Sequence, residues 1–265
     1  MSITLFCIAL LTSIVGSICG IGGGVIIKPV LDAMNIMSVS AISFLSGCTV
    51  LAMAVVSVGK NLRNGQVPIN RRTTPALGVG AAVGGVVGKL LFNAIKSYAG
   101  NESLVGMVQA LVLALITVLT LVYMLLEKGG RIHTRRLDHL AVSVVIGLVL
   151  GLMSSFLGIG GGPINLAVLS FFFSMNTKEA AINSLCVILI SQIASLLQTF
   201  ATGSVPAVSP LFLCAMIAGG IVGGLVGQTI NKRLNAGQVG RLFNVLLVVV
   251  TAISLYNAFR FAAQL

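Results

Sequence analysis

Eight long apolar segments run through the 265 residues of this chain, and they constrain its fold more than any other feature. A run of about 20 apolar residues can cross the hydrocarbon core of a membrane as a helix. Only 8% of the residues are charged, against about 25% in soluble domains, and the segments do not alternate polar and apolar residues as barrel strands do. We therefore predict an all-α polytopic membrane protein. The segments cover residues 3–34, 38–59, 72–97, 102–126, 139–173, 179–200, 207–231 and 239–263.

The rest of the composition argues against several classes of protein. The net charge of +11 comes without a basic stripe interleaved with aromatic residues, so we expect no nucleic-acid partner. The five cysteines have apolar neighbours and are interpreted as small buried side chains. The two histidines, His133 and His139, belong to no cluster with metal-ligand spacing. We expect no metal, no cofactor and no enzyme activity, because no acid–base or nucleophile constellation is present.

The sequence repeats itself after 138 residues. "GIGGGVIIKPVL" at Gly20–Leu31 aligns with "GIGGGPINLAVL" at Gly158–Leu169, and "GQVP" at 65–68 aligns with "GSVP" at 203–206. With a shift of one more residue, "VGGVVGKLL" at Val83 meets "VGGLVGQTI" at Val222. We predict two repeats of four segments each, 1–127 and 139–265, joined by a charged linker at 128–138. Internal repeats of this kind are typical of secondary transporters.

The two GIGGG stretches, Gly20–Gly24 and Gly158–Gly162, are expected to break the first segment of each repeat. Each glycine inside a helix costs about 1 kcal/mol relative to alanine. Backbone that is opened at membrane depth must find partners in protein or in a water-filled cavity. The helix that starts after each break, helped by Pro163 in the second repeat, offers free amides to an anion. We predict that the two breaks face one shared site near the pseudo-symmetry axis.

The basic residues help to choose between two topologies. Either all eight segments cross the membrane, or each glycine segment enters and turns back as a re-entrant hairpin. With hairpins, 12 of the 16 lysines and arginines share one side, which fits the positive-inside rule better and makes the repeats inverted. We therefore expect loops 60–72, 127–138 and 231–241 to face the cytoplasm. A discontinuous spanning helix would carry the same glycine motif, so this alternative stays open.

The duplicated motif on so apolar a chain resembles the TauE/SafE family, also called the 4-toluene sulfonate uptake permease family. The resemblance covers the whole chain and assigns the family's glycine motifs to Gly20, Gly22, Gly23 and Gly24, and to Gly158, Gly160, Gly161 and Gly162. It implies a multi-pass protein of the cytoplasmic (inner) membrane that transports small sulfur-containing or carboxylate anions. Members differ in substrate and direction, so neither is decided by the resemblance.

A few polar residues complete the predicted site. Lys28 lies one turn past the first break and could supply a positive charge, with an ion pair to Asp32 as the equal alternative. Lys89 and Gln228 share one repeat position, and Lys89 is a weaker candidate for the substrate path. The predicted substrate-binding residues are Gly22, Gly23, Gly24, Lys28, Ser46, Gly160, Gly161, Gly162, Asn165 and Asn183.

These features predict a secondary transporter of small anions such as sulfite, thiosulfate or an organosulfonate. A passive anion channel and a non-transporting membrane scaffold are the alternatives. The expected partners are the small anion and the lipid bilayer, and a homodimer is one option for the assembly. Two further glycine sets with a spacing of four are expected to pack helices closely: Gly80, Gly84 and Gly88, and Gly219, Gly223 and Gly227.

Overall fold

The computed structural model describes residues 1–65, 67–99, 102–128, 134, 137 and 139–264. Within these residues the chain forms ten helices and no strand. Their bounds are α1 Ser2–Cys19, α2 Gly24–Met34, α3 Val39–Asn64, α4 Thr73–Ala99, α5 Glu102–Lys128, α6 Leu140–Leu157, α7 Ile164–Phe173, α8 Thr177–Ala201, α9 Pro210–Arg233 and α10 Ala236–Ala262.

Eight of the described helices are long and apolar enough to cross a membrane, and this confirms the prediction of an all-helical polytopic protein. The two shorter helices are α2, with 11 residues, and α7, with 10. Each follows a glycine stretch, so the segments 3–34 and 139–173 each contain two helices rather than one. Most of the charged linker 128–138 lies outside the described residues.

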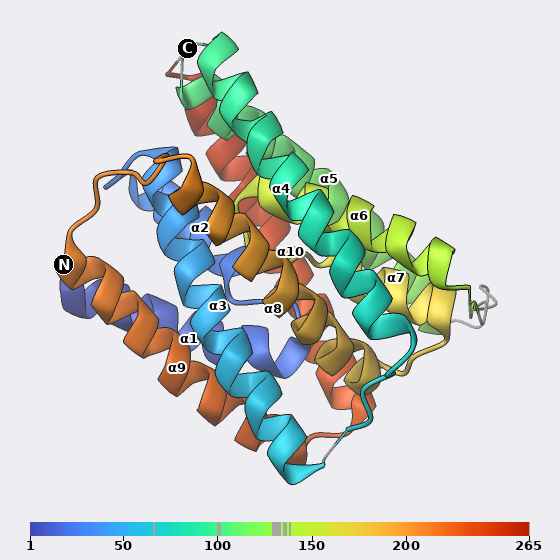
Figure 1. Ribbon diagram of the computed structural model, residues 1–265. Helices are drawn as coiled ribbons and strands as arrows, with labels where there is room; N and C mark the ends of the chain where they lie inside the picture. Colours follow the sequence, from blue (N-terminus) through green and yellow to red (C-terminus); the bar gives the residue numbers. More distant parts are fainter. Residues whose placement is uncertain (66, 100–101, 129–133, 135–136, 138, 265) are drawn as a thin grey trace.

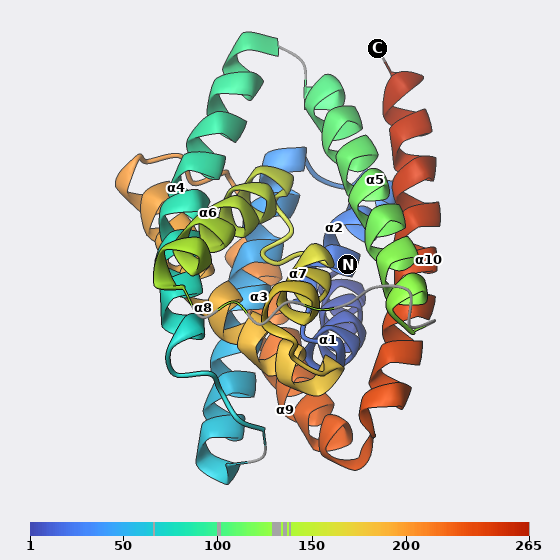
Figure 2. The same cartoon turned by 90° about the vertical axis from the view of Figure 1, so that its right-hand side faces the viewer.

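Helices α3 and α8 contact each other in the middle of the molecule. Helices α1 and α9 run side by side, with α9 packed on α3, and α4 and α6 run side by side, with α4 packed on α8 (Figure 1). The long helices α5 and α10 pack together on another side (Figure 2). The first helix of each half thus packs on a helix of the other half, since α1 lies on α9 and α6 lies on α4.

Glycines allow these two pairs of helices to approach closely. A Cβ atom added at Gly80, Gly84 or Gly88 of α4 would collide with backbone carbonyl groups of α6, at Val144, Leu148 and Leu152. On α9, a Cβ atom at Gly219, Gly223 or Gly227 would lie within 3 Å of backbone oxygens of α1. The predicted packing role of both glycine sets is therefore confirmed.

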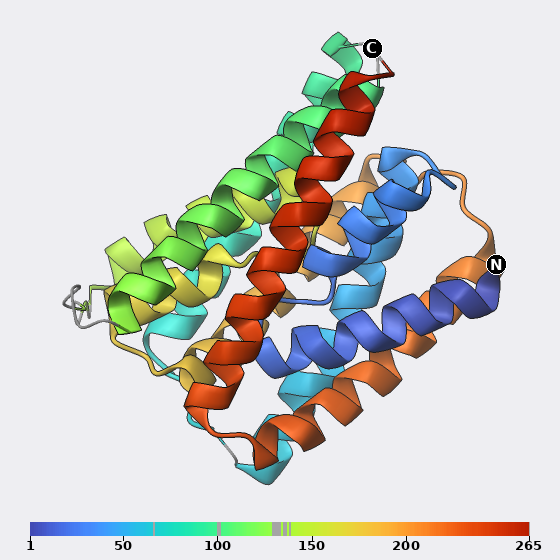
Figure 3. The same ribbon diagram turned by 180° about the vertical axis from the view of Figure 1, so that it is seen from behind.

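Each glycine stretch is the vertex of two diverging helices. Helices α1 and α2 form a V in Figure 3, with the first stretch at its point. The chain also turns back at the second glycine stretch, between α6 and α7. The amide of Leu137, just before α6, donates to the carbonyl of Phe172 near the end of α7, at 2.9 Å. Both vertices lie against the central helices α3 and α8.

Lys60 and Lys178 both bond to the end of α9 or to the residue that follows it. The Lys60 ammonium donates to Thr229 near the end of α9, and the Lys178 ammonium donates to the carbonyl of Leu234, at 2.6 Å. Lys96 lies at the end of α4, where it pairs with Glu102 at the start of α5, at 2.6 Å. The end of α3 and the start of α8 therefore each lie next to the last part of α9 or the residue after it.

Candidate functional site

The two glycine stretches touch each other. A Cβ atom added at Gly24 would collide with the carbonyl group of Ile159, and one added at Gly161 would lie 2.7 Å from the carbonyl oxygen of Ile21. A Cβ atom at Gly22 would lie 3.8 Å from the carbonyl oxygen of Gly160. Side chains larger than hydrogen would therefore separate the two vertices, which explains why glycine occupies these positions.

Both stretches adopt the same backbone conformation. The φ angle is +72° at Gly20 and +76° at Gly22, and it is +65° at Gly158 and +68° at Gly160. This left-handed region is unfavourable for residues with a Cβ atom. The repeated motif thus encodes a repeated turn, which ends one helix and starts another.

The turn leaves buried amide groups without partners. Within the described residues, the amides of Gly22, Gly23, Gly24 and Val25 donate no hydrogen bond to the protein, although these residues are buried. The same holds for the amides of Gly160, Gly161 and Gly162 in the second stretch. Buried amides are nearly always paired in folded proteins, so two sets of free donors in contact indicate a place for a ligand or ordered water.

Buried hydroxyl groups without partners surround the stretches. The Ser46 oxygen lies 2.7 Å from the Cβ position of Gly24, and the Ser13 oxygen lies 3.1 Å from that of Gly23. Ser43 approaches Gly158 in the same way. None of these three hydroxyls has a hydrogen-bond partner in the described part of the chain, and both Ser13 and Ser46 are 0% exposed. They add hydrogen-bond donors from α1 and α3 to the free amides.

Among the other predicted site residues, Asn165 is part of this region. Its amide group donates to Ser184 at 3.3 Å, while its carbonyl oxygen has no partner among the described residues. Apolar side chains fill part of the space, because Val50 and Ile188 lie against both stretches. The surroundings of the two vertices are therefore partly polar and partly apolar.

The structure does not bring Lys28 to the free amides. Its ammonium group donates to Asp32 at 2.9 Å, and both side chains are buried on the side of α2 that faces α5 and α10. The ion pair that the sequence offered as the alternative is thus present. The reason is the rotation of α2, which is fixed by its contact with α10.

The side chain of Asn183 also forms hydrogen bonds away from the glycine stretches. Its carbonyl oxygen accepts from the amide of Asn70, at 2.9 Å, and from the hydroxyl of Thr74. Its amide group donates to the carbonyls of Glu179, at 2.7 Å, and Pro68, at 3.4 Å. Three of these four bonds join α8 to the segment from Pro68 to Thr74 and the fourth lies within α8, so in this structure the side chain of Asn183 is engaged by the protein itself.

A polar cavity adjoins the second glycine stretch. It has a volume of about 20 Å³, and its lining includes Gly158, Gly160, Ser155, Gln192 and Lys89. This volume holds about one water molecule. Lys89 also lines a larger cavity of about 400 Å³ between the end of α4 and the loop after α8. The sequence indicated Lys89 only weakly, whereas the structure sets it beside the glycines.

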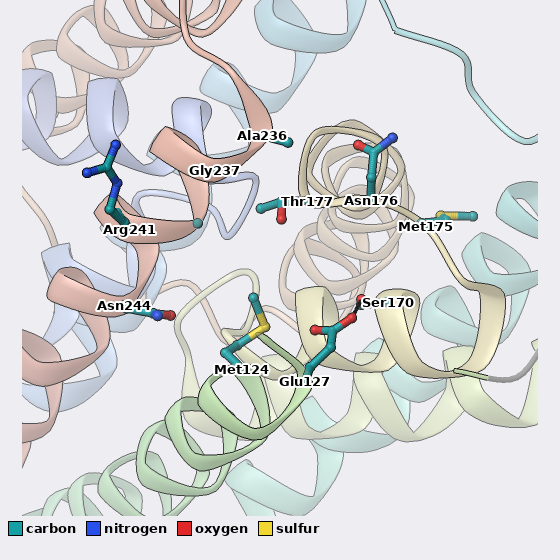
Figure 4. Close-up of a pocket in the computed structure, with 11 residues that line it drawn as sticks. Met124, Glu127, Ser170, Met175, Asn176, Thr177, Ala236, Gly237, Arg241 and Asn244 are labelled. Atoms are coloured by element: carbon teal, nitrogen blue, oxygen red, sulfur yellow. Dashed lines mark hydrogen bonds between the residues drawn. The ribbon is translucent and has the colours of Figure 1, made fainter. Parts of the chain in front are cut away.

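Another cavity, of about 350 Å³, lies at the end of the bundle that carries the basic loops (Figure 4). Its lining includes Glu127, Ser170, Arg241 and Asn244, and the Ser170 hydroxyl donates to Glu127. No residue of a glycine stretch lines this cavity, and its lining contains one acidic residue, Glu127, and one basic residue, Arg241. It is therefore not part of the glycine site.

Ser13 and Ser155 are candidate site residues that sequence reasoning missed. Both lie in apolar helices, where serine commonly bonds to a neighbouring helix or to its own backbone. Ser155 occurs in the last turn before a glycine stretch, and this proximity is the signal that could have identified it.

The sequence matches a known protein family. A family model described as "Sulfite exporter TauE/SafE" matches residues 5–254, nearly the whole chain. Neither a curated protein nor a solved structure matches the sequence.

Proposed function

The chain belongs to the TauE/SafE family of sulfite exporters, and on that premise we propose that it is a secondary transporter of small anions in the cytoplasmic membrane. The proposed substrates are sulfite, thiosulfate, organosulfonates and related small carboxylates. The anion binds between the two glycine stretches, where both halves of the chain contribute donors. The protein acts as a carrier and not as an enzyme.

One observation carries this proposal: buried donors without partners converge from both repeats. The amides around Gly23 and Gly161 begin short helices, whose dipoles favour negative charge. The hydroxyl of Ser46 adds a neutral donor. An oxyanion has enough acceptor sites for all of these groups, and it would remove the cost of leaving them unpaired.

We further propose that the repeats are inverted and that each glycine unit is a re-entrant hairpin. If all eight segments crossed, residues 60–72 and the start of α8 would lie on opposite sides of the membrane. The hydrogen bond from Asn70 to Asn183 joins these regions, and the bond between Leu137 and Phe172 closes the second hairpin. The end that carries loops 60–72, 127–138 and 231–241 then faces the cytoplasm.

Uptake into proteoliposomes tests the proposed function. We expect labelled thiosulfate or an alkyl sulfonate to enter, and preloaded unlabelled anion to accelerate entry, because a carrier exchanges substrates. Ser46→Ala should raise KM about tenfold or more, since a hydrogen bond to a charged group contributes about 1.5–3 kcal/mol. Absence of both uptake and anion binding in the wild-type protein would refute the proposal, and single-channel currents would identify a channel instead.

Two comparisons make this experiment specific. Thr49→Val on the same helix removes a buried hydroxyl that already bonds to the carbonyl of Leu45, at 2.8 Å, so its KM should stay unchanged. Gly161→Ala introduces a methyl group 2.7 Å from the carbonyl oxygen of Ile21, so it should abolish transport. Wild-type uptake by both Ser46→Ala and Gly161→Ala would exclude the glycine stretches as the site.

A further inference from the structure

Lys89 carries a positive charge that nothing in the described chain compensates. Its ammonium group forms no ion pair or hydrogen bond with a described residue. The ammonium nitrogen lies over the ring of Phe92, 5.2 Å from the ring centroid. The described acids are engaged elsewhere: Asp32 with Lys28, Glu102 with Lys96, Glu127 with Ser170 and Glu179 in the N-cap of α8. An unpaired charge inside a membrane segment is costly and indicates a functional group.

Lys89 lies ten residues before the end of α4, about 15 Å along the helix axis. It lines both the cavity of about 400 Å³, which is large enough for a small anion, and the cavity of about 20 Å³ next to Gly158 and Gly160. The inner cavity also exposes the hydroxyls of Ser43 and Ser155, which have no partner among the described residues. Lys89 therefore borders both the large cavity and the small cavity beside the second glycine stretch.

The equivalent position of the other repeat holds a hydrogen-bonded side chain. Gln228 replaces Lys89 there, and its amide group donates to the carbonyl and hydroxyl oxygens of Ser17, at 3.3 and 3.2 Å. The Ser17 hydroxyl also lies 3.0 Å from that of Ser57. Ser155 takes the place of Ser17 beside Lys89, and its hydroxyl is unpaired. The position in the second repeat thus carries a neutral, hydrogen-bonded side chain, whereas Lys89 carries a charge and lines two cavities.

We propose that Lys89 forms an anion-binding subsite for small oxyanions at the inner end of the large cavity, where an anion binds before it reaches the glycine stretches. This inference rests on the proposed transport function. The ammonium group supplies up to three donors, and the neighbouring Asn93 and Ser40 line the same cavity. Because the inner cavity has room for only about one water molecule, passage beyond Lys89 requires a conformational change.

Kinetics of three variants in proteoliposomes test the subsite. Lys89→Gln installs the side chain of the equivalent position and should raise the KM for thiosulfate and methanesulfonate at least about tenfold, because a charged hydrogen bond is lost. Lys89→Arg keeps the charge and should retain most of the affinity. Lys96→Gln is the matched control, since Lys96 lines the same cavity but is already paired with Glu102, and its KM should change little.

Thermal melting of the purified variants separates binding from folding and from transport. Sodium thiosulfate, compared with sodium chloride at equal ionic strength, should raise the melting temperature of the wild-type protein and of Lys96→Gln, and should raise that of Lys89→Gln clearly less, because this variant keeps only the site at the glycine stretches. A wild-type response in Lys89→Gln, in both KM and melting, would overturn the subsite while leaving the transport function intact. An anion response that depends on Lys89 without any flux would support the subsite and refute the transport function.

Discussion

The Lys28 ammonium and the Asp32 carboxylate form a buried ion pair one turn apart on α2, with an N–O distance of 2.9 Å and exposed fractions of 3% and 6%. Their surroundings are polar, because the second Asp32 oxygen and the side-chain oxygens of Gln109 and Asn257 have no partner among the described residues. These groups line one cavity of about 10 Å³, which is about the space that one bridging water needs. The pair therefore lies where α2 faces α5 and α10.

Replacement of Lys28 should destabilise the protein without changing its affinity for anions. Lys28→Met leaves the Asp32 carboxylate buried and unpaired, and breaking such a pair costs about 3–5 kcal/mol. Lys28→Met combined with Asp32→Leu should recover much of this loss, because no buried charge remains. Melting temperatures in detergent and the KM of the surviving protein check both statements. A large increase in KM for the double variant would instead assign Lys28 to substrate binding.

Asn183 should prove to be a structural residue. Asn183→Leu removes three hydrogen bonds between α8 and the segment Pro68–Thr74, and each buried group left unpaired costs about 1–3 kcal/mol. We expect a lower melting temperature and faster trypsin cleavage at Arg71 and Arg72, which are exposed on that segment. Unchanged cleavage together with a raised KM would return Asn183 to the substrate site.

The sequence predicted the parts of the site that depend on local chemistry. Four glycines in five positions cannot continue a stable helix, and the break therefore follows from Gly20–Gly24 alone. The pairing of Asn183 with Asn70 joins residues 113 apart, and no local pattern indicates it. The choice between two roles for Lys28 depends on how α2 is rotated against α10, which is a tertiary contact. Lys89 stood out as a charge in an apolar helix, but its lack of a partner is visible only in three dimensions.

Gly84 should not tolerate a methyl group. A Cβ atom there would collide with the carbonyl group of Leu148, and overpacking of this kind costs about 1–3 kcal/mol. We expect Gly84→Ala to lower the melting temperature by separating α4 from α6. Gly59→Ala is the matched control, because a Cβ atom at Gly59 meets nothing within 4 Å, and its melting temperature should stay equal or rise. Equal behaviour of both variants would show that α4 and α6 are not in close contact.

The contact between Gln228 and Ser17 should limit the access of water to the end of α1. Gln228→Leu removes both hydrogen bonds to Ser17, so the end of α1 should separate from α9 more often. Cys19, the buried last residue of α1, is a suitable reporter in a protein whose other four cysteines are replaced by serine. A water-soluble thiol reagent should label it faster in Gln228→Leu than in the parent protein.

Thr229→Val, one residue further on, removes a hydroxyl that bonds to its own helix and to Lys60, and should leave the labelling rate unchanged. Equal rates in all three proteins would mean that Gln228 does not control access along α1.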